Sequence, residues 1–144
     1  MGATVREAMT PGVQFVDPRQ PVVAAATLMR ENDVGSLPVV DNGRLVGIVT
    51  DRDIVMRGVA ERADLETLPV GLISSPEVLA TAPGESLDDA LHLMARHRVR
   101  RLPVVEDGRL VGILAQADVA IVARDKAAGE MLEEISQPTS HARS

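Results

Sequence analysis

The stretch that decides the fold is LPVVDNGRLVGI at residues 37–48, which returns as LPVVEDGRLVGI at residues 102–113. The second copy follows the first by 65 residues. Carrying the same shift, without a gap, over residues 5–53 and 70–118 gives 19 identities in 49 aligned positions. This agreement indicates an internal duplication, so the chain consists of two copies of one unit of about 60 residues.

Each copy has the same order of predicted elements. A short extended segment at 13–16 or 78–81 leads to a helix, which in the second copy carries an apolar stripe at helical spacing: Leu87, Ala90, Leu91 and Met94. Ser86 is the expected N-cap of that helix, with Asp89 as its capping-box partner. Two apolar runs follow, at 37–40 and 45–49 in the first copy, and an Asn-Gly or Asp-Gly turn between such runs predicts a hairpin. A second helix is expected from Asp51 or Gln116, which makes each unit βαββα.

The fold class that follows is α+β, with two βαββα repeats packed about a pseudo-two-fold axis. A unit of about 60 residues buries little core by itself, so the two copies are expected to pack against each other. We place repeat 1 at residues 4–60, a linker at 61–68, and repeat 2 at 69–124. Residues 125–144 are expected to continue the last helix to about residue 135, weakened at Gly129, and to end in a frayed polar tail at 137–144.

Composition excludes several classes of function. The 144 residues are 45% hydrophobic and 25% charged, as in an ordinary globular protein, and contain no cysteine for a disulfide, a thiolate metal site or a nucleophile. A net charge of −6 disfavours polyanion partners, and Phe15 is the only aromatic residue, so bases have no stacking platform. Neither a leader pattern nor a spanning apolar run is present, so we expect a cytoplasmic protein that does not associate with membranes.

The strongest local pattern for a binding site is GIVTDRD at residues 47–53, where a predicted strand meets a helix. Gly47 would allow close backbone approach, Thr50 offers a hydroxyl beside a helix N-terminus, and the Asp53 carboxylate could accept both hydroxyls of a ribose. Thr50, Asp51 or Asp53 could instead only cap the first turn of the helix. The pattern leaves both interpretations open.

The order of these landmarks, from MTP at 9–11 through both LPVV runs to TDRD at 50–53, resembles the CBS domain family over about residues 4–124. The resemblance implies that the pair forms one module, which commonly dimerises and binds adenosine-containing ligands in clefts between the repeats. It assigns ribose to Asp53 and ribose or phosphate to Thr50, with Arg52 in the same run. The second copy keeps Asp118 but has Ala115 in place of the hydroxyl residue, so its site either holds ribose through Asp118 or is empty.

The resemblance also suggests residues around a bound nucleotide. Arg100 and Arg101 replace Gly35 and Ser36 of the first copy and are expected to contact phosphate, the alternative being solvated surface or a salt bridge. Base contacts would come from the first strand and the Pro-Val strand, or these residues would belong to the core. They are Val13, Pro38, Val78 and Pro103.

The function expected from the sequence is that of a non-catalytic regulatory module with an adenine nucleotide ligand. AMP, ADP or ATP is favoured over NAD or S-adenosylmethionine. A homodimer and an unidentified protein partner are expected, and a metal site, a nucleic-acid partner or a membrane is not. The alternative is a ligand-free scaffold for dimerisation and docking, which Ala115 favours.

Overall fold

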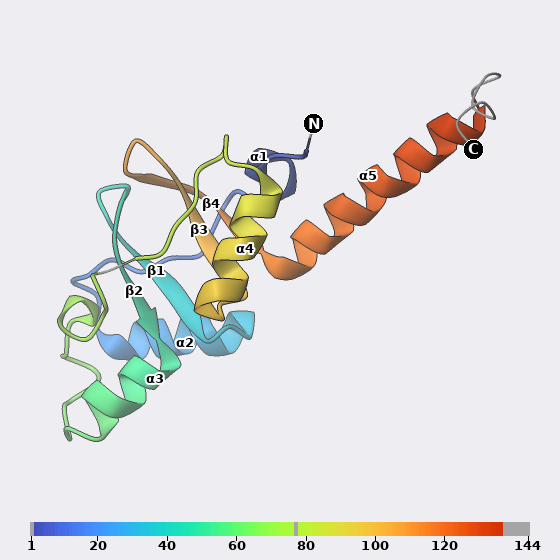
Figure 1. Cartoon of the computed structure of the whole chain (residues 1–144). Helices are drawn as coiled ribbons and strands as arrows, with labels where there is room; N and C mark the ends of the chain where they lie inside the picture. Colours follow the sequence, from blue (N-terminus) through green and yellow to red (C-terminus); the bar gives the residue numbers. More distant parts are fainter. Residues whose placement is uncertain (1, 77, 137–144) are drawn as a thin grey trace.

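The computed structural model describes residues 2–76 and 78–136, and the side chains of that range up to residue 129. The two repeats form two lobes side by side, and the last helix extends away from them (Figure 1). Along the chain the elements are α1 (Val5–Ala8), α2 (Val22–Asn32), β1 (Ser36–Asp41), β2 (Arg44–Thr50), α3 (Asp51–Asp53), the π-helix η1 (Ile54–Val59), the 3-10 helix η2 (Val70–Leu72), α4 (Leu87–His97), β3 (Arg101–Glu106), β4 (Arg109–Ala115) and α5 (Gln116–Ser136).

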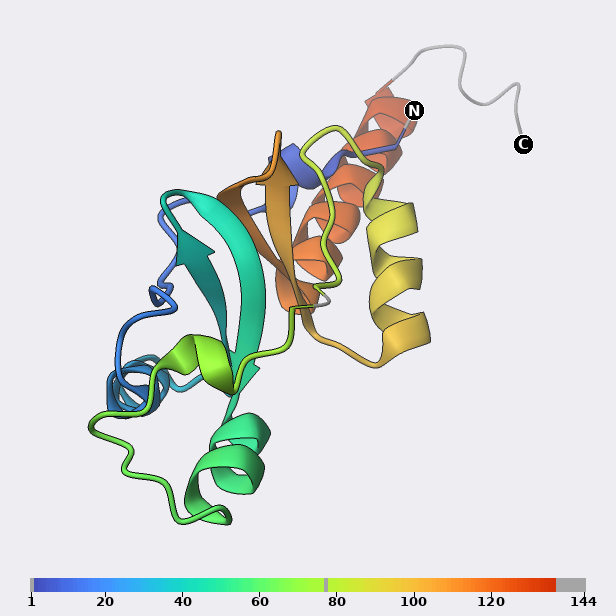
Figure 2. The same cartoon turned by 90° about the vertical axis from the view of Figure 1, so that its left-hand side faces the viewer.

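Within the described ranges the strands form one four-stranded sheet in the order β1-β2-β4-β3. Each repeat contributes an antiparallel hairpin, and the two hairpins join at the register pair Arg44 and Arg109 of β2 and β4. Two backbone bonds flank this pair, from the Leu45 N–H to the Gly108 carbonyl at 3.1 Å and from the Leu110 N–H to the Gly43 carbonyl at 3.2 Å. Because these residues are 65 apart, the pseudo-two-fold axis passes between them. Figures 1 and 2 both show the hairpin turns lying side by side at this point.

The hairpin turns have the left-handed backbone that the Asn-Gly and Asp-Gly pairs predict. In the first turn φ is 56° at Asn42 and 85° at Gly43, and in the second it is 53° at Asp107 and 79° at Gly108. Positive φ at both central residues is the type I′ geometry, whose twist matches that of the flanking strands. The α+β fold of two repeated units is confirmed, although the first predicted strand of each unit, at 13–16 and 78–81, is reduced to one parallel bridge, at Val16 and at Thr81.

The core of each repeat is completed by the N-terminal segment of the other repeat. The N-terminal arm, residues 3–10, supplies Val5 to the core of repeat 2, and the middle arm, residues 68–75, supplies Val70 to the core of repeat 1. Both valines are fully buried. They are 65 residues apart, so the exchange of arms obeys the internal symmetry.

The backbone bonds of the arms repeat with the same shift. Thr10 and Ile113 exchange two N–H to carbonyl bonds of 2.8 and 3.0 Å, and Ser75 and Ile48 exchange two of 2.8 and 2.9 Å. Surface ion pairs add to the N-terminal arm, where Arg6 lies 3.5 Å from Glu106 and Glu7 lies 3.7 Å from Lys126 of α5. Each arm therefore forms an isolated antiparallel bridge to the sheet, the N-terminal arm to β4 and the middle arm to β2.

The segment expected to be a linker, residues 61–68, packs on repeat 1. The carbonyls of Leu65 and Leu68 accept the N–H groups of Val23 and Val22 at 2.9 and 2.8 Å. Pro21 stands at the N-cap of α2 and offers no side-chain cap, so these carbonyls satisfy the first N–H groups of the helix. The segment thus caps α2 as well as connecting the repeats.

The last helix, α5, runs to Ser136 and includes Gly129. Val119 is buried in the core of repeat 2 and Val122 packs against it, after which the side chains from Ala123 to Gly129 are exposed. The predicted tail at 137–144 lies outside the described residues. In the described part of the chain, every helix is too short or too polar to cross a membrane.

Candidate functional site

Thr50 and Asp53 lie together where β2 ends and α3 begins. The Thr50 hydroxyl accepts the Asp53 N–H at 3.0 Å, and Oδ2 of Asp53 accepts the Thr50 N–H at 2.9 Å. These two bonds form a capping box that fixes both side chains, each of them half-buried. Thr50 and Asp53 therefore do cap the first turn of the helix. A carboxylate has about four acceptor positions, so Asp53 can still accept a hydrogen bond from a ligand.

The neighbours of this pair are small or acidic. The Gly35 carbonyl accepts the Asp51 N–H at 2.9 Å, and a Cβ added to Gly35 would lie 3.1 Å from the Asp51 carboxylate. Ser36 pairs with Thr50 across β1 and β2. Arg52 is exposed, and its N–H donates to Oδ1 of Asp51 at 2.8 Å. The first repeat thus offers carboxylates and a hydroxyl beside a loop of small residues.

The second repeat has the same backbone with different side chains. The Arg100 carbonyl accepts the Gln116 N–H at 2.8 Å, and Arg101 pairs with Ala115 across β3 and β4. Arg100 and Arg101 are exposed and Asp118 is half-buried in the first turn of α5. Because Ala115 has no hydroxyl, no counterpart of the Thr50 cap forms there. This end of repeat 2 is therefore basic where that of repeat 1 is acidic.

The apolar candidates divide into two kinds. Pro38 and Pro103 are buried in β1 and β3, and their carbonyls accept the N–H groups of Val16 and Thr81, each at 3.0 Å. Both strands are sheet edges, where a residue without an N–H can be accommodated. Val13 and Val78 are half-buried. The prolines are therefore core residues in this structure, whereas the valines retain accessible surface.

The groups that lie against Gly47 and Gly112 were not predicted from the sequence. A Cβ at Gly47 would lie 2.9 Å from the Ser75 carbonyl oxygen, and one at Gly112 would lie 3.0 Å from the Thr10 carbonyl oxygen. The close approach is thus made by the two arms rather than by a ligand. The signal available in the sequence was that the repeat extends back to Val5 and Val70, outside the βαββα units.

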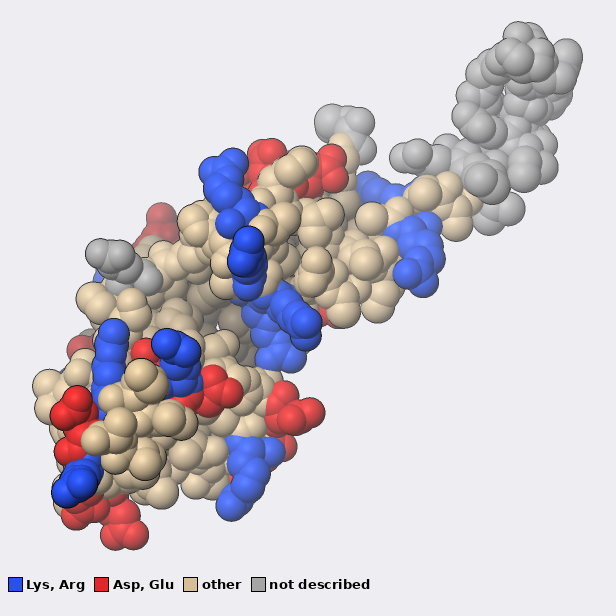
Figure 3. Space-filling model, turned by 60° about the horizontal axis from the view of Figure 1, so that its bottom comes forward, with Lys and Arg blue, Asp and Glu red and all other residues tan. Residues whose placement is uncertain are grey.

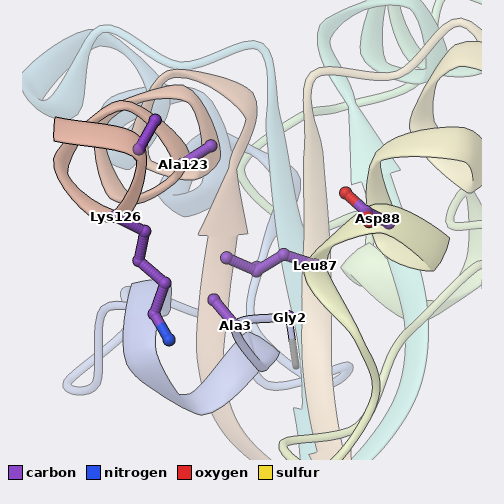
Figure 4. Close-up of a pocket in the computed structure, with 7 residues that line it drawn as sticks. Gly2, Ala3, Leu87, Asp88, Ala123 and Lys126 are labelled. Carbon is purple, nitrogen blue, oxygen red and sulfur yellow. The ribbon is translucent and has the colours of Figure 1, made fainter. Parts of the chain in front are cut away.

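The surface between the lobes is hollowed on the side away from the hairpin turns. Figure 3 shows this hollow, with Lys and Arg side chains bordering it on the lobe from which α5 extends, whereas the other lobe carries both acidic and basic side chains. A separate shallow hollow of about 190 Å³ lies between the N-terminal arm, α4 and α5, lined by Ala3, Leu87, Asp88 and Lys126 among others (Figure 4). None of the predicted site residues lines this second hollow.

Among the described residues, no three His, Cys, Asp or Glu side chains gather closely enough to hold a metal ion. The chemistry that the described residues offer where β2 meets α3 and where β4 meets α5 is hydrogen bonding by carboxylates, a hydroxyl and guanidinium groups. Such groups suit a polar, phosphorylated ligand.

Comparison with known proteins gives consistent results. The model of the CBS domain matches residues 5–59 and 70–125. The CBS domain-containing protein YhcV of Bacillus subtilis is 42% identical over 140 residues, covering 96% of this chain and 99% of the relative. Hypoxic response protein 1 of Mycobacterium tuberculosis is 38% identical over 136 residues, covering 94% and 95%.

Solved structures agree in fold. Hypoxic Response Protein I, solved with two coordinated zinc ions, superposes with a TM-score of 0.74 at 40% identity, covering 83% of this chain and 98% of that chain. CBSX2 of Arabidopsis thaliana, solved in complex with AMP, superposes with a TM-score of 0.75 at 33% identity, covering 88% and 99%. The duplicated sequence, the paired βαββα lobes and these matches lead to one conclusion: the chain belongs to the CBS domain family and consists of a CBS pair.

Proposed function

We propose that this CBS pair is a non-catalytic regulatory module that binds an adenosine-containing ligand between its repeats. AMP, ADP or ATP is the favoured ligand, and the bound state acts on a partner protein or on a homodimer. The observation that carries the proposal is the pairing of the Thr50 hydroxyl with the Asp53 carboxylate, held in place by reciprocal bonds at 3.0 and 2.9 Å. A carboxylate fixed in this way can accept the two ribose hydroxyls without first being ordered, which lowers the entropic cost of binding.

The proposed roles follow from the side chains present where β2 meets α3 and where β4 meets α5. Asp53 holds ribose, Thr50 contacts ribose or phosphate, and Arg52 lies beside them on the exposed side. Asp118 is the corresponding ribose ligand in the second repeat, where Arg100 and Arg101 supply positive charge for phosphate. Val13 and Val78 provide accessible apolar surface for the base, with Pro38 and Pro103 behind them in the sheet. The AMP complex of CBSX2 supports the choice of ligand class.

A ligand-free scaffold is the second candidate function, and two observations favour it. The capping box already gives Thr50 and Asp53 a structural role, and Ala115 removes the hydroxyl from the second repeat. In this case the pair would serve only to dimerise and to dock a partner.

The first experiment uses the lack of Trp and Tyr, which makes the protein almost transparent near 280 nm. An absorbance band at 260 nm in the purified protein, with a discrete adenine nucleotide released on heating and identified by mass spectrometry, is the expected result. If the band is absent, the wild type is titrated with AMP, ADP and ATP while thermal unfolding is followed. Ligand at 100 times its Kd should stabilise the protein by about 2.7 kcal/mol.

The deciding variant is Asp53→Ala, which should lower nucleotide affinity about 10- to 150-fold, the usual contribution of a charged hydrogen bond. Asp53→Asn is the matched control for folding, because its amide oxygen can still accept the Thr50 N–H while the charge is lost. We expect Asn to keep the stability of the helix start and to lose most of the affinity. Nucleotide binding as tight as wild type in both variants would refute the site, and no response to any adenosine ligand would favour the scaffold.

A further inference from the structure

Arg44 and Arg109 face each other at the junction of the two hairpins. They are the directly opposed residues of β2 and β4, so their side chains leave the same face of the sheet close together. Both are exposed, and the turns that precede them lie side by side at the end of the sheet farthest from α3 (Figures 1 and 2). Like charges in this relation destabilise a sheet unless something compensates them.

The two guanidinium groups are held against the backbone of the opposite repeat. Arg109 lies over Gly43 and Arg44 lies over Gly108, so closely that a Cβ on either glycine would overlap with the guanidinium. Nη1 of Arg44 also donates to the Asp107 carbonyl at 3.4 Å. Each side chain therefore crosses the pseudo-two-fold axis and rests on the other turn, which restricts its freedom before any ligand arrives.

The carboxylates best placed to compensate these arginines are engaged elsewhere. Asp41 is the register partner of Arg44, but it accepts a hydrogen bond from Arg19 at 2.8 Å. That bond is the main reason why the pKa of Arg19 is raised above its ordinary value.

Glu106, the register partner of Arg109, pairs instead with Arg6 at 3.5 Å. Over the described part of the chain, no carboxylate lies within 4.0 Å of the guanidinium nitrogens of Arg44 or Arg109. The two cations at the axis are thus left without an anion from the described residues.

We propose that Arg44 and Arg109 form an oxyanion site on the pseudo-two-fold axis, which takes a doubly charged tetrahedral anion such as inorganic phosphate. A guanidinium presents two parallel N–H donors that match the oxygens of phosphate, and two such groups from opposite strands can hold one dianion between them. The anion would contact both repeats at once. This site is separate from the proposed nucleotide site, since Thr50 and Asp53 lie at the other end of β2.

The test is a titration with inorganic phosphate in chloride buffer at low ionic strength, followed by the ³¹P NMR line width. We expect saturable binding of one phosphate per chain, weakened about tenfold or more by Arg44→Ala and by Arg109→Ala. Arg30→Ala, an exposed arginine of α2, is the matched control and should bind as wild type does. Nucleotide titration of the same variants separates the two proposed sites, because Arg44→Ala and Arg109→Ala should leave nucleotide affinity unchanged.

A second pair of variants tests the sign of the charge effect. Asp107 is the acidic residue of the turn on which Arg44 rests, and Asn42 occupies the equivalent position under Arg109. Asp107→Asn should therefore tighten phosphate binding and Asn42→Asp should weaken it, while both residues remain compatible with the turn. A lack of saturable binding, a loss caused by Arg101→Ala but not by Arg44→Ala, or equal effects of the two turn variants would overturn the proposal.

Discussion

At the scale of single residues, the glycine of each binding pattern is explained by contact with an arm. Gly47→Ala would place a methyl group 2.9 Å from the Ser75 carbonyl oxygen and 3.3 Å from the Ser74 hydroxyl. Because the nearest atom belongs to the backbone, the middle arm must shift. We expect destabilisation by roughly 1–3 kcal/mol in urea unfolding.

Gly84→Ala is the matched control, because a Cβ there meets no atom within 4 Å. It should leave stability unchanged or raise it slightly through the entropy of the unfolded chain. Equal stability of the Gly47 and Gly84 variants would contradict the assigned contact.

Residues whose role depends on near neighbours were the ones the sequence predicted well. Ser86 accepts the Asp89 N–H at 3.0 Å, as expected of an N-cap, although the return bond from the Ser86 N–H to the Asp89 carboxylate is not formed. Capping boxes occur at Thr4 and Glu7 and at Thr50 and Asp53, the second being one of the two interpretations that the sequence left open. The partner of Gly47 could not be predicted, since Ser75 is distant in sequence and belongs to neither hairpin.

At the scale of elements, the exchanged arms predict an exchange of mutational effects. Val5 lies at the start of repeat 1 but is buried in the core of repeat 2, and Val70 lies at the start of repeat 2 but is buried in the core of repeat 1. Each Val→Ala change should cost about 2 kcal/mol from lost burial and the remaining cavity. In hydrogen exchange, Val5→Ala should reduce amide protection most in β3 and β4, and Val70→Ala most in β1 and β2.

The opposite distribution of protection would show that each arm stabilises its own repeat.

The hairpins and long helices were predictable because the hydrophobic period and the turn residues are local signals in the sequence. The arm exchange and the capping of α2 by residues 61–68 were not, because both depend on backbone groups brought together only in the folded molecule.

At the scale of the whole molecule, one pair of exposed apolar side chains is related by the internal symmetry. Met56 of η1 and Ile121 of α5 are 65 residues apart and each exposes 52% of its surface. Val55 and Val59 beside Met56 are exposed as well. Apolar side chains exposed on η1 and α5 are suited to burial in an isologous homodimer, in which both subunits contribute the same surface.

We therefore expect a concentration-dependent homodimer in sedimentation velocity, shifted towards monomer when Met56→Glu and Ile121→Glu are combined. Burying unpaired carboxylates at an interface is costly, whereas Phe15→Glu, at a half-exposed residue in neither position, should leave association unchanged. A wild-type protein that stays monomeric at high concentration would refute the homodimer.

The exchanged arms also bear on how such a chain could have arisen. A single unit of this kind cannot close its own core, since the residue that fills it comes from the segment before the other unit. An ancestor with one unit would have needed a second chain to lend that segment, and its folding would have depended on protein concentration. Duplication within one gene would replace that intermolecular contact by an intramolecular one, so that folding no longer requires association with a second chain.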